Sequence, residues 1–141
     1  MADTFQFDLV SPESRLASGQ ATAVRLPGAD GDMTAMPDHA PTVTTLRPGM
    51  LVVEMDGGEQ ECAVFGDLAQ ITAERCTVLA DLAMPRSEVT SEILSERIAK
   101  AREDQQKSEG SAADDIAKVL ADLVAVGDTI GIPVESRVPA P

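Results

Sequence analysis

The residues best suited to chemistry lie in one short stretch, where Asp38 precedes the only histidine of the chain, His39. An imidazole beside a carboxylate is able to transfer protons, but covalent catalysis also needs an oriented nucleophile, and no Gly-x-Ser-x-Gly elbow is present. Three roles stay open for His39: a turn residue with one ring nitrogen bonded to the backbone, a contact with a partner, or an acid or base. We expect no catalytic residues.

Two further carboxylates, Asp30 and Asp32, flank Gly31. Calcium loops place oxygen ligands at regular positions and end in a bidentate Glu, and this stretch does neither. The glycines also fit none of the patterns that hold nucleotide phosphates. We therefore expect a solvated turn here, and neither a metal nor a cofactor. Cys62 and Cys76 fit no metal spacing either, and we expect two buried reduced thiols, with a disulfide as the open alternative.

Composition narrows the function classes. The chain has 141 residues and a formal net charge of −13, which argues against a general nucleic-acid binder and against adhesion to anionic lipid. Aromatic residues make up 2%, so the core must be mostly aliphatic. No apolar run approaches the roughly 20 residues that cross a bilayer, and no secretory signal is expected at the N-terminus.

The elements that must position these residues fall into two domains. Over residues 1–84, short apolar runs are cut by Pro, Gly and Asp turn signals, which predicts about ten short antiparallel strands in a β-sandwich or flattened barrel. Phe5 to Ser11 alternates as a half-buried strand does. Arg15 to Gly19 and Ala21 to Leu26 are predicted as two separate strands.

Residues 85–131 change to a helical composition and predict a domain made of an antiparallel two-helix hairpin. The first helix is expected from Ser91 to Lys107, with Thr90 or Ser91 as its N-cap. The second is expected from about Ala113 to Val126, ended by three helix breakers, Gly127, Gly131 and Pro133. Residues 132–141 are rich in proline and predict a loose tail.

The most distinctive motifs lie between Val24 and Gly49. They are Pro-Gly-x-x-Gly-Asp from Pro27, Pro-x-His-Ala-Pro from Pro37, and x-x-Leu-Arg-Pro-Gly ending at Gly49. Together with Phe7-Asp-Leu-Val-Ser11 they resemble the ε subunit of F-type ATP synthases, which is called δ in mitochondria. Asp38, Asp67 and Thr34 stand where that family usually has glycine. Asp tolerates the left-handed conformation better than most residues, so Asp38 and Asp67 need not disturb the fold.

This resemblance implies a rotor subunit of the central stalk that couples the γ subunit to the c-ring and has no activity of its own. It implies a loop facing the c-ring at Asp30, Gly31 and Asp32, and a peripheral location on the cytoplasmic face of a bacterial inner membrane. The positions that the resemblance implies to face γ are Ser11, His39, Thr44, Met50 and Leu68. For two of them, Met50 and Leu68, an ordinary core position is the alternative.

In bacterial relatives the helical hairpin is able to unfold and inhibit ATP hydrolysis, with its basic residues opposite an acidic loop of the β subunit. Here the expected second helix carries one basic residue, Lys118, against Asp114, Asp115 and Asp122, which favours a weak regulatory role. Some relatives bind ATP through Ile/Leu-Asp-x-x-Arg-Ala. The matching segment from Leu94 has Ser95 for the Asp and Ile98 for the Arg, so we expect no ATP binding.

Two functions of different classes remain at this point. One is the non-catalytic stalk subunit that the resemblance implies. The other is a free-standing β-sandwich that binds a small molecule and carries a helical appendage. A third, less favoured function is an acid/base hydrolase that uses His39 and Asp38, and it predicts that the pure protein turns over a substrate.

Overall fold

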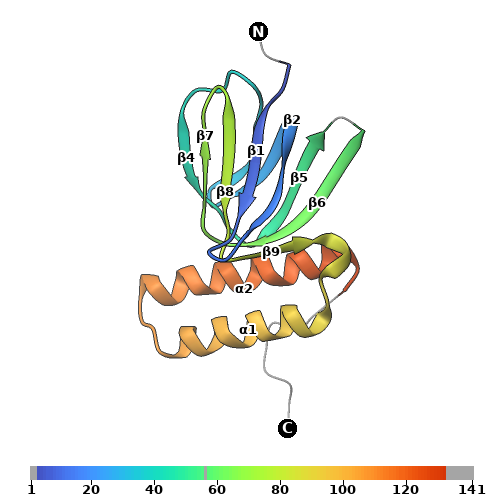
Figure 1. Ribbon diagram of the computed structural model, residues 1–141. Helices are drawn as coiled ribbons and strands as arrows, with labels where there is room; N and C mark the ends of the chain where they lie inside the picture. Colours follow the sequence, from blue (N-terminus) through green and yellow to red (C-terminus); the bar gives the residue numbers. More distant parts are fainter. Residues whose placement is uncertain (1–2, 56, 133–141) are drawn as a thin grey trace. The chain divides into compact units, whose positions relative to one another are not determined.

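The computed structural model describes residues 3–55 and 57–132, and its chain divides into two compact units, Met1–Arg86 and Ser87–Pro141. The first unit is built from strands and the second from helices (Figure 1). The expected antiparallel sandwich followed by a helical hairpin is confirmed, although one strand pair is parallel. Apart from residue 132, the tail predicted at 132–141 lies outside the described residues.

The strands form two layers that share one long strand, β2 (Arg15–Gly28). The first half of β2 pairs with β1 (Phe5–Val10), and β1 pairs on its other side with β8 (Arg75–Leu79) in parallel. The second half of β2 pairs with β3 (Gly31–Ala35) and β5 (Gly49–Met55). The first sheet is completed by β7 (Leu68–Ile71) and β4 (Thr42–Thr45), and the second by β6 (Gly58–Phe65) and β9 (Leu82–Pro85).

The prediction of two strands at 15–19 and 21–26 was wrong. Gly19 does not end a strand, because it pairs with Phe7 in the middle of the β1–β2 ladder. The ladder continues to Ala21, which pairs with Phe5 on one side and with Met55 on the other. The described residues therefore contain nine strands in one continuous hydrogen-bonded sheet, whose two halves, the first and the second sheet, are joined by β2.

The core between the sheets is aliphatic apart from two phenylalanines. Phe5 and Phe7 project from β1 into the interior and are each 1% exposed. Branched aliphatic side chains from both sheets surround them, which gives the sandwich one continuous apolar interior. Cys62 and Cys76 belong to this interior as free thiols, so the predicted reduced state agrees with their burial.

The helical unit consists of α1 (Ser91–Gln106) and α2 (Ser111–Ile130), which pack against each other. A 3₁₀ turn, η1 (Arg86–Glu88), precedes them. Thr90 is the N-cap of α1, because its hydroxyl accepts a hydrogen bond from the Ile93 N–H at 3.2 Å. Buried residues of the two helices include Leu94, Ile98, Ala101, Leu120, Leu123 and Val126.

The prediction that Gly127 ends the second helix was wrong. Gly127 is buried inside α2, and a single helical glycine costs only about 1 kcal/mol relative to alanine. The helix ends instead at Gly131, whose φ of 82° is the left-handed conformation typical of a C-cap glycine. The helix consequently continues to Ile130, beyond its predicted end at Val126.

Candidate functional site

His39 lies in the loop between β3 and β4, where it takes part in a tight turn. Its Nδ1 is 2.7 Å from the Ala40 carbonyl oxygen, and its backbone N–H donates to the Met36 carbonyl at 3.2 Å. Asp38 has a φ of 67°, and its N–H donates to the Ala73 carbonyl. This geometry gives His39 the turn role that the sequence allowed, and it confirms that Asp38 adopts the left-handed conformation.

The first and the third of the motifs between residues 27 and 49 pack onto each other at one end of the sandwich. The Arg47 N–H donates to the Pro27 carbonyl at 2.9 Å, and the Arg47 guanidinium donates to the Gly28 carbonyl at 2.5 Å. A Cβ at Gly49 would stand 2.6 Å from the Pro27 Cβ, and one at Gly28 would stand 2.6 Å from the Gly31 carbonyl oxygen. The two motif glycines are therefore required by close approach, and we call this cluster the motif junction.

The predicted loop of Asp30, Gly31 and Asp32 is the tip of the β2–β3 hairpin. Asp32 is 78% exposed at its side chain, yet its Oδ1 accepts a hydrogen bond from the Arg47 guanidinium at 2.5 Å. Among the described residues nothing forms a hydrogen bond or ion pair with the Asp30 carboxylate. The tip thus presents one free carboxylate and one that a neighbouring arginine partly neutralises. No group of three metal-ligating side chains occurs within the described ranges.

The five positions that the resemblance implied for γ do not share one face. Thr44 pairs with the buried Ala69, so its side chain points inward, whereas Leu68 points to the outer side of the first sheet. Met50 alternates with the core residue Leu51 and points to the outer side of the second sheet. Ser11 follows the last residue of β1, and His39 lies about 20 Å away, beyond the first residue of that strand.

An apolar row crosses the outer side of the first sheet. In the ladders Thr45 faces Leu68, Leu68 faces Leu79, and Leu79 faces Val10, so Leu68, Leu79 and Val10 are cross-strand neighbours on one face. Leu79 is 40% exposed, and Leu16 on β2 and Val43 on β4 are exposed by 43% and 66%. We define the apolar row as the three cross-strand neighbours Val10, Leu68 and Leu79 together with two aliphatic residues outside their line, Val43, which faces Gln70, and Leu16, which has no partner in the β1–β2 register.

Only one member of the apolar row, Leu68, was singled out from the sequence. The sequence did hold a signal for three of the others, Val10, Val43 and Leu79. Each stands next to a residue that alternation assigns to the core or to a strand end, so each is expected on the outer side of its strand. They were missed because a single exposed aliphatic residue is ordinary. The ladder register brings them together, and the sequence does not contain that register.

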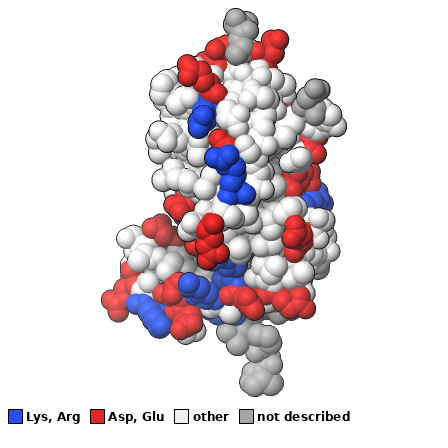
Figure 2. All heavy atoms as spheres, viewed as in Figure 1, with Lys and Arg blue, Asp and Glu red and all other residues white. Residues whose placement is uncertain are grey.

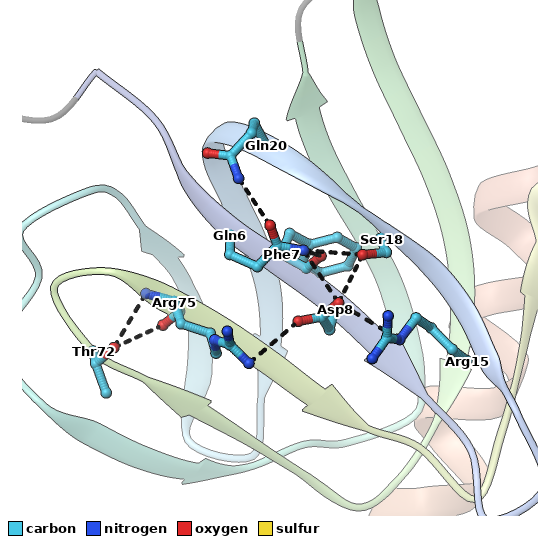
Figure 3. Close-up of polar contacts among 8 residues, drawn as sticks. All are labelled: Gln6, Phe7, Asp8, Arg15, Ser18, Gln20, Thr72 and Arg75. Carbon is cyan, nitrogen blue, oxygen red and sulfur yellow. Dashed lines mark hydrogen bonds and ion pairs between the residues drawn. The ribbon is translucent and has the colours of Figure 1, made fainter.

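A polar cluster lies beside the apolar row on the same face, centred on Asp8 (Figure 3). The Asp8 side chain is 8% exposed, and its Oδ1 accepts hydrogen bonds from the Ser18 hydroxyl at 2.7 Å and from the Gln6 amide at 3.3 Å. Arg15 and Arg75 approach the two carboxylate oxygens at 3.8 Å each. The hydrogen bond from Ser18 lowers the pKa of Asp8, burial opposes this, and Gln6, Arg15 and Arg75 lower it further.

The helical unit carries the segment that was compared with an ATP-binding motif. Ile98, which stands where that motif has its arginine, is 2% exposed and belongs to the buried stripe of α1. Leu94 is buried one turn earlier, and Ser95 is exposed. Position 98 therefore serves packing within the helical unit. No helix of the described chain is both long and apolar enough to cross a membrane.

Comparison with known proteins places these features in a family. Residues 4–86 match the family model described as "ATP synthase, Delta/Epsilon chain, beta-sandwich domain". The chain is 55% identical to the ATP synthase epsilon chain of Ruegeria sp. (strain TM1040), with 90% of this chain and 96% of the relative covered. It is 49% identical to the epsilon chain of Rhodobacter capsulatus, with 94% and 100% covered, and 50% identical to that of Paracoccus denitrificans (strain Pd 1222), with 94% of each covered.

Solved structures agree on the fold. A chain of the Euglena gracilis mitochondrial ATP synthase (OSCP/F1/c-ring, rotational state 1) superposes with a TM-score of 0.71 at 20% identity, covering 92% of this chain and 83% of the other. A chain of the Tetrahymena thermophila mitochondrial ATP synthase central stalk and c-ring gives a TM-score of 0.54 at 14% identity, covering 81% and 94%. On the sequence matches, this chain belongs to the ATP synthase epsilon chain family, the non-catalytic central-stalk subunits of F-type ATP synthases.

Proposed function

We propose that this subunit joins the γ subunit to the c-ring and passes torque between them, with γ covering the outer side of the first sheet. The apolar row carries this proposal, because Leu68, Leu79 and Val10 are neighbours across β7, β8 and β1, and because Leu16, Val43 and Leu79 are exposed. Together they form a surface suited to burial by a partner. Family membership supports the joint itself and sets aside the free-standing ligand-binding alternative.

The mechanical load explains why such a surface is needed. Each proton that crosses about 100 mV releases about 2.3 kcal/mol, and several protons drive one synthesis event, so the joint bears on the order of 10 kcal/mol. A joint that does not slip under this load should bury at least a standard interface of about 1,600 Å² in total. The apolar row supplies the central part of such an interface.

Among the five implied γ contacts, Leu68 and Ser11 are the two that belong with this surface. Leu68 is a member of the apolar row, and Ser11 directly follows Val10, another member. The remaining three, His39, Thr44 and Met50, fall outside this surface, because they lie respectively at the far end of the sheet, on its inner side, and on the outer side of the second sheet.

Leu79→Asp tests the γ contact. The substitution places a charge at the centre of the apolar row, and because Leu79 is 40% exposed the folding cost is small. We expect at least a tenfold loss of affinity for F1 from which this subunit has been removed, measured by surface-immobilised binding. Val52→Asp is the matched control, since Val52 is half-buried on β5 and faces Arg25. Unchanged binding of Leu79→Asp would contradict the proposed γ surface.

We further propose that the tip at Asp30, Gly31 and Asp32 contacts polar loops of the c-ring, so that the subunit is held peripherally on the cytoplasmic face of a bacterial inner membrane. Both carboxylates at the tip are exposed and suit basic or amide groups. Because Arg47 already pairs with Asp32, Asp30→Lys should weaken attachment to the c-ring more than Asp32→Asn does. Co-purification of the c-ring measures this, and unchanged attachment after charge reversal at both positions would remove the assignment.

For the helical hairpin we propose a weak regulatory contact with β subunits and no nucleotide binding. The buried Ile98 and the acidic first turn of α2 support this, because neither offers a positively charged group to ATP or to an acidic loop. Isothermal titration with ATP should give no heat of binding. An affinity in the micromolar range, or strong activation of ATPase after removal of residues from Glu88 onward, would contradict it.

A further inference from the structure

The sandwich unit is acidic, and its few arginines are nearly all matched to carboxylates. Residues 1–86 contain 13 Asp and Glu, five Arg and no Lys. Arg25 pairs with Glu59 at 3.2 Å, Arg47 with Asp32 at 2.5 Å, and Arg86 with Glu61 at 2.6 Å. Acidic side chains accordingly outnumber basic ones in the space-filling view (Figure 2).

The exception is the pair of Arg15 and Arg75, which share one carboxylate, Asp8. Two positive charges against one negative charge leave a local excess of one positive charge. Their distances of 3.8 Å to Asp8 are longer than those of the other three pairs, and their side chains are 68% and 62% exposed. Across the described chain neither guanidinium forms a hydrogen bond, so their N–H groups are directed at solvent or at a partner.

The position of this arginine pair relates it to the apolar row. Arg15 comes from β2 and Arg75 from β8, the two strands that flank β1, and Asp8 lies between them (Figure 3). Asp8 and Val10 are two residues apart on β1 and point to the same side, about 7 Å from each other along the strand. The positive charges therefore border the apolar row on one edge.

Asp8 itself is poorly placed to receive a partner, because its carboxylate is almost fully covered. Ser18 and Gln6 satisfy its Oδ1, so its charge is held by the sheet and is not offered to solvent. Its effect is to hold two exposed guanidinium groups at fixed places over the face. Guanidinium groups bind carboxylates through two parallel hydrogen bonds, which gives direction as well as attraction.

We propose that Arg15 and Arg75 receive a carboxylate of the γ subunit and so set the register in which γ lies on the apolar row. This rests on the proposed γ contact of the first sheet. An apolar row alone permits sliding along its length, whereas one directional ion pair at its edge fixes a single arrangement. A carboxylate partner is the occupant that the charges select, since the rest of this sandwich repels acidic surfaces.

The test uses the full chain and F1 from which this subunit has been removed. Arg15→Gln with Arg75→Gln should weaken binding about tenfold or more and flatten its dependence on salt concentration, because the screened attraction is gone. The control is Arg25→Gln, which removes an exposed arginine of the second sheet and should leave both quantities unchanged. Arg15→Lys with Arg75→Lys keeps the charge, loses the planar fork, and should recover only part of the affinity.

The two proposals fail in different ways. If Leu79→Asp weakens binding while the double Gln variant and its salt dependence match the wild type, the arginine pair has no role in docking and the γ surface stands. If both variants bind like the wild type, the γ surface itself is overturned, and this inference with it. Unfolding of the double Gln variant in urea, compared with the Lys variant, separates a loss of fold from a loss of contact.

Discussion

Gly49→Ala should destabilise the sandwich through one contact in the motif junction. The added Cβ would stand 2.6 Å from the Pro27 Cβ and 3.2 Å from the Pro27 Cγ. Carbon atoms attract optimally at about 3.5–4.0 Å, so roughly 1 Å of movement is required. Neither atom is able to rotate away, because a Cβ is fixed by its backbone and the proline ring is rigid. Two strands, β5 and β2, must therefore separate locally.

The expected cost follows from overpacking in a close-packed region, which is about 1–3 kcal/mol, and the rigidity of both atoms favours the upper half of that range. Gly19→Ala is the matched control. Its nearest contact is the Met55 Cε at 3.2 Å, the end of a flexible side chain, and Gly19 lies in regular strand. Alanine there also reduces the freedom of the unfolded chain, so we expect between no change and about 1 kcal/mol of stabilisation.

Urea unfolding followed by circular dichroism measures both variants, since the chain contains no Trp or Tyr for fluorescence. Gly49→Ala should lower the free energy of unfolding by about 2 kcal/mol more than Gly19→Ala does. Pro27→Gly in the Gly49→Ala background removes the colliding ring and should recover part of the loss, which a double-mutant cycle isolates. Equal stability of the two single variants would refute the reasoning that close approach at the motif junction requires glycine at position 49.

Three further outcomes follow from burial and charge. Leu123→Ala should lower the free energy of unfolding of the helical unit by about 2–5 kcal/mol. Amide exchange in α1 and α2 should accelerate while sandwich amides keep their protection, and uniform acceleration would contradict this. The pKa of Asp8 is held below the usual range of an aspartate, so its contribution to stability is present above that range and is lost as pH falls through the folded pKa. Asp8→Asn should therefore reduce the difference in the free energy of unfolding between pH 6 and pH 3, and an unaltered difference would contradict this. Burial raises the pKa of Cys76 to about 12, so its alkylation at pH 8 should match the rate of unfolding, and fast labelling of native protein would contradict it.

The order of the elements was predictable because two different hydrophobic periods separate the halves of the chain. Alternation with frequent turn residues indicated strands up to about residue 84, and a stripe of one residue per helical turn indicated the two helices. The cap at Thr90 was predictable for the same reason, since a hydroxyl just before an apolar stripe satisfies a free N–H of the first turn.

The misplaced boundaries have a common cause. Gly19 and Gly127 were interpreted as breaks, yet both lie inside regular elements and have ordinary backbone angles. Gly19 is retained by ladder pairing on β1, and Gly127 by burial within α2. Glycine permits a strand or helix to end without requiring it, so tertiary contacts decide its conformation. The local sequence does not reveal those contacts. Asp38 and Asp67, in contrast, do take positive φ, at 67° and 80°, as the substituted glycine positions suggested.

The surfaces were less predictable than the fold. Membership in the apolar row depends on the ladders that join β4, β7, β8 and β1, and these include a parallel pair whose partner residues, such as Val10 and Leu79, are 69 positions apart in sequence. The partner of Asp32 was equally hidden, because Arg47 reaches it only when the motif junction closes. Periodicity states which side of a strand is buried, and it does not state which strands are neighbours.

In the proposed arrangement, β2 is the element that connects the two contacts. Its first half pairs with β1 beneath the γ-facing side, and its second half ends at Gly28, next to the tip assigned to the c-ring. The fourteen residues of this one strand, which has a register shift in its ladders with β1 and with β5, run from one contact to the other. Load applied to the apolar row reaches the tip along β2 and also more directly, because Thr45 pairs with Leu68 and its carbonyl accepts a hydrogen bond from the Ala29 N–H at 2.8 Å. Arg47 completes this path, because it fastens the tip to the segment that begins β5 and so reduces bending of the hairpin under load.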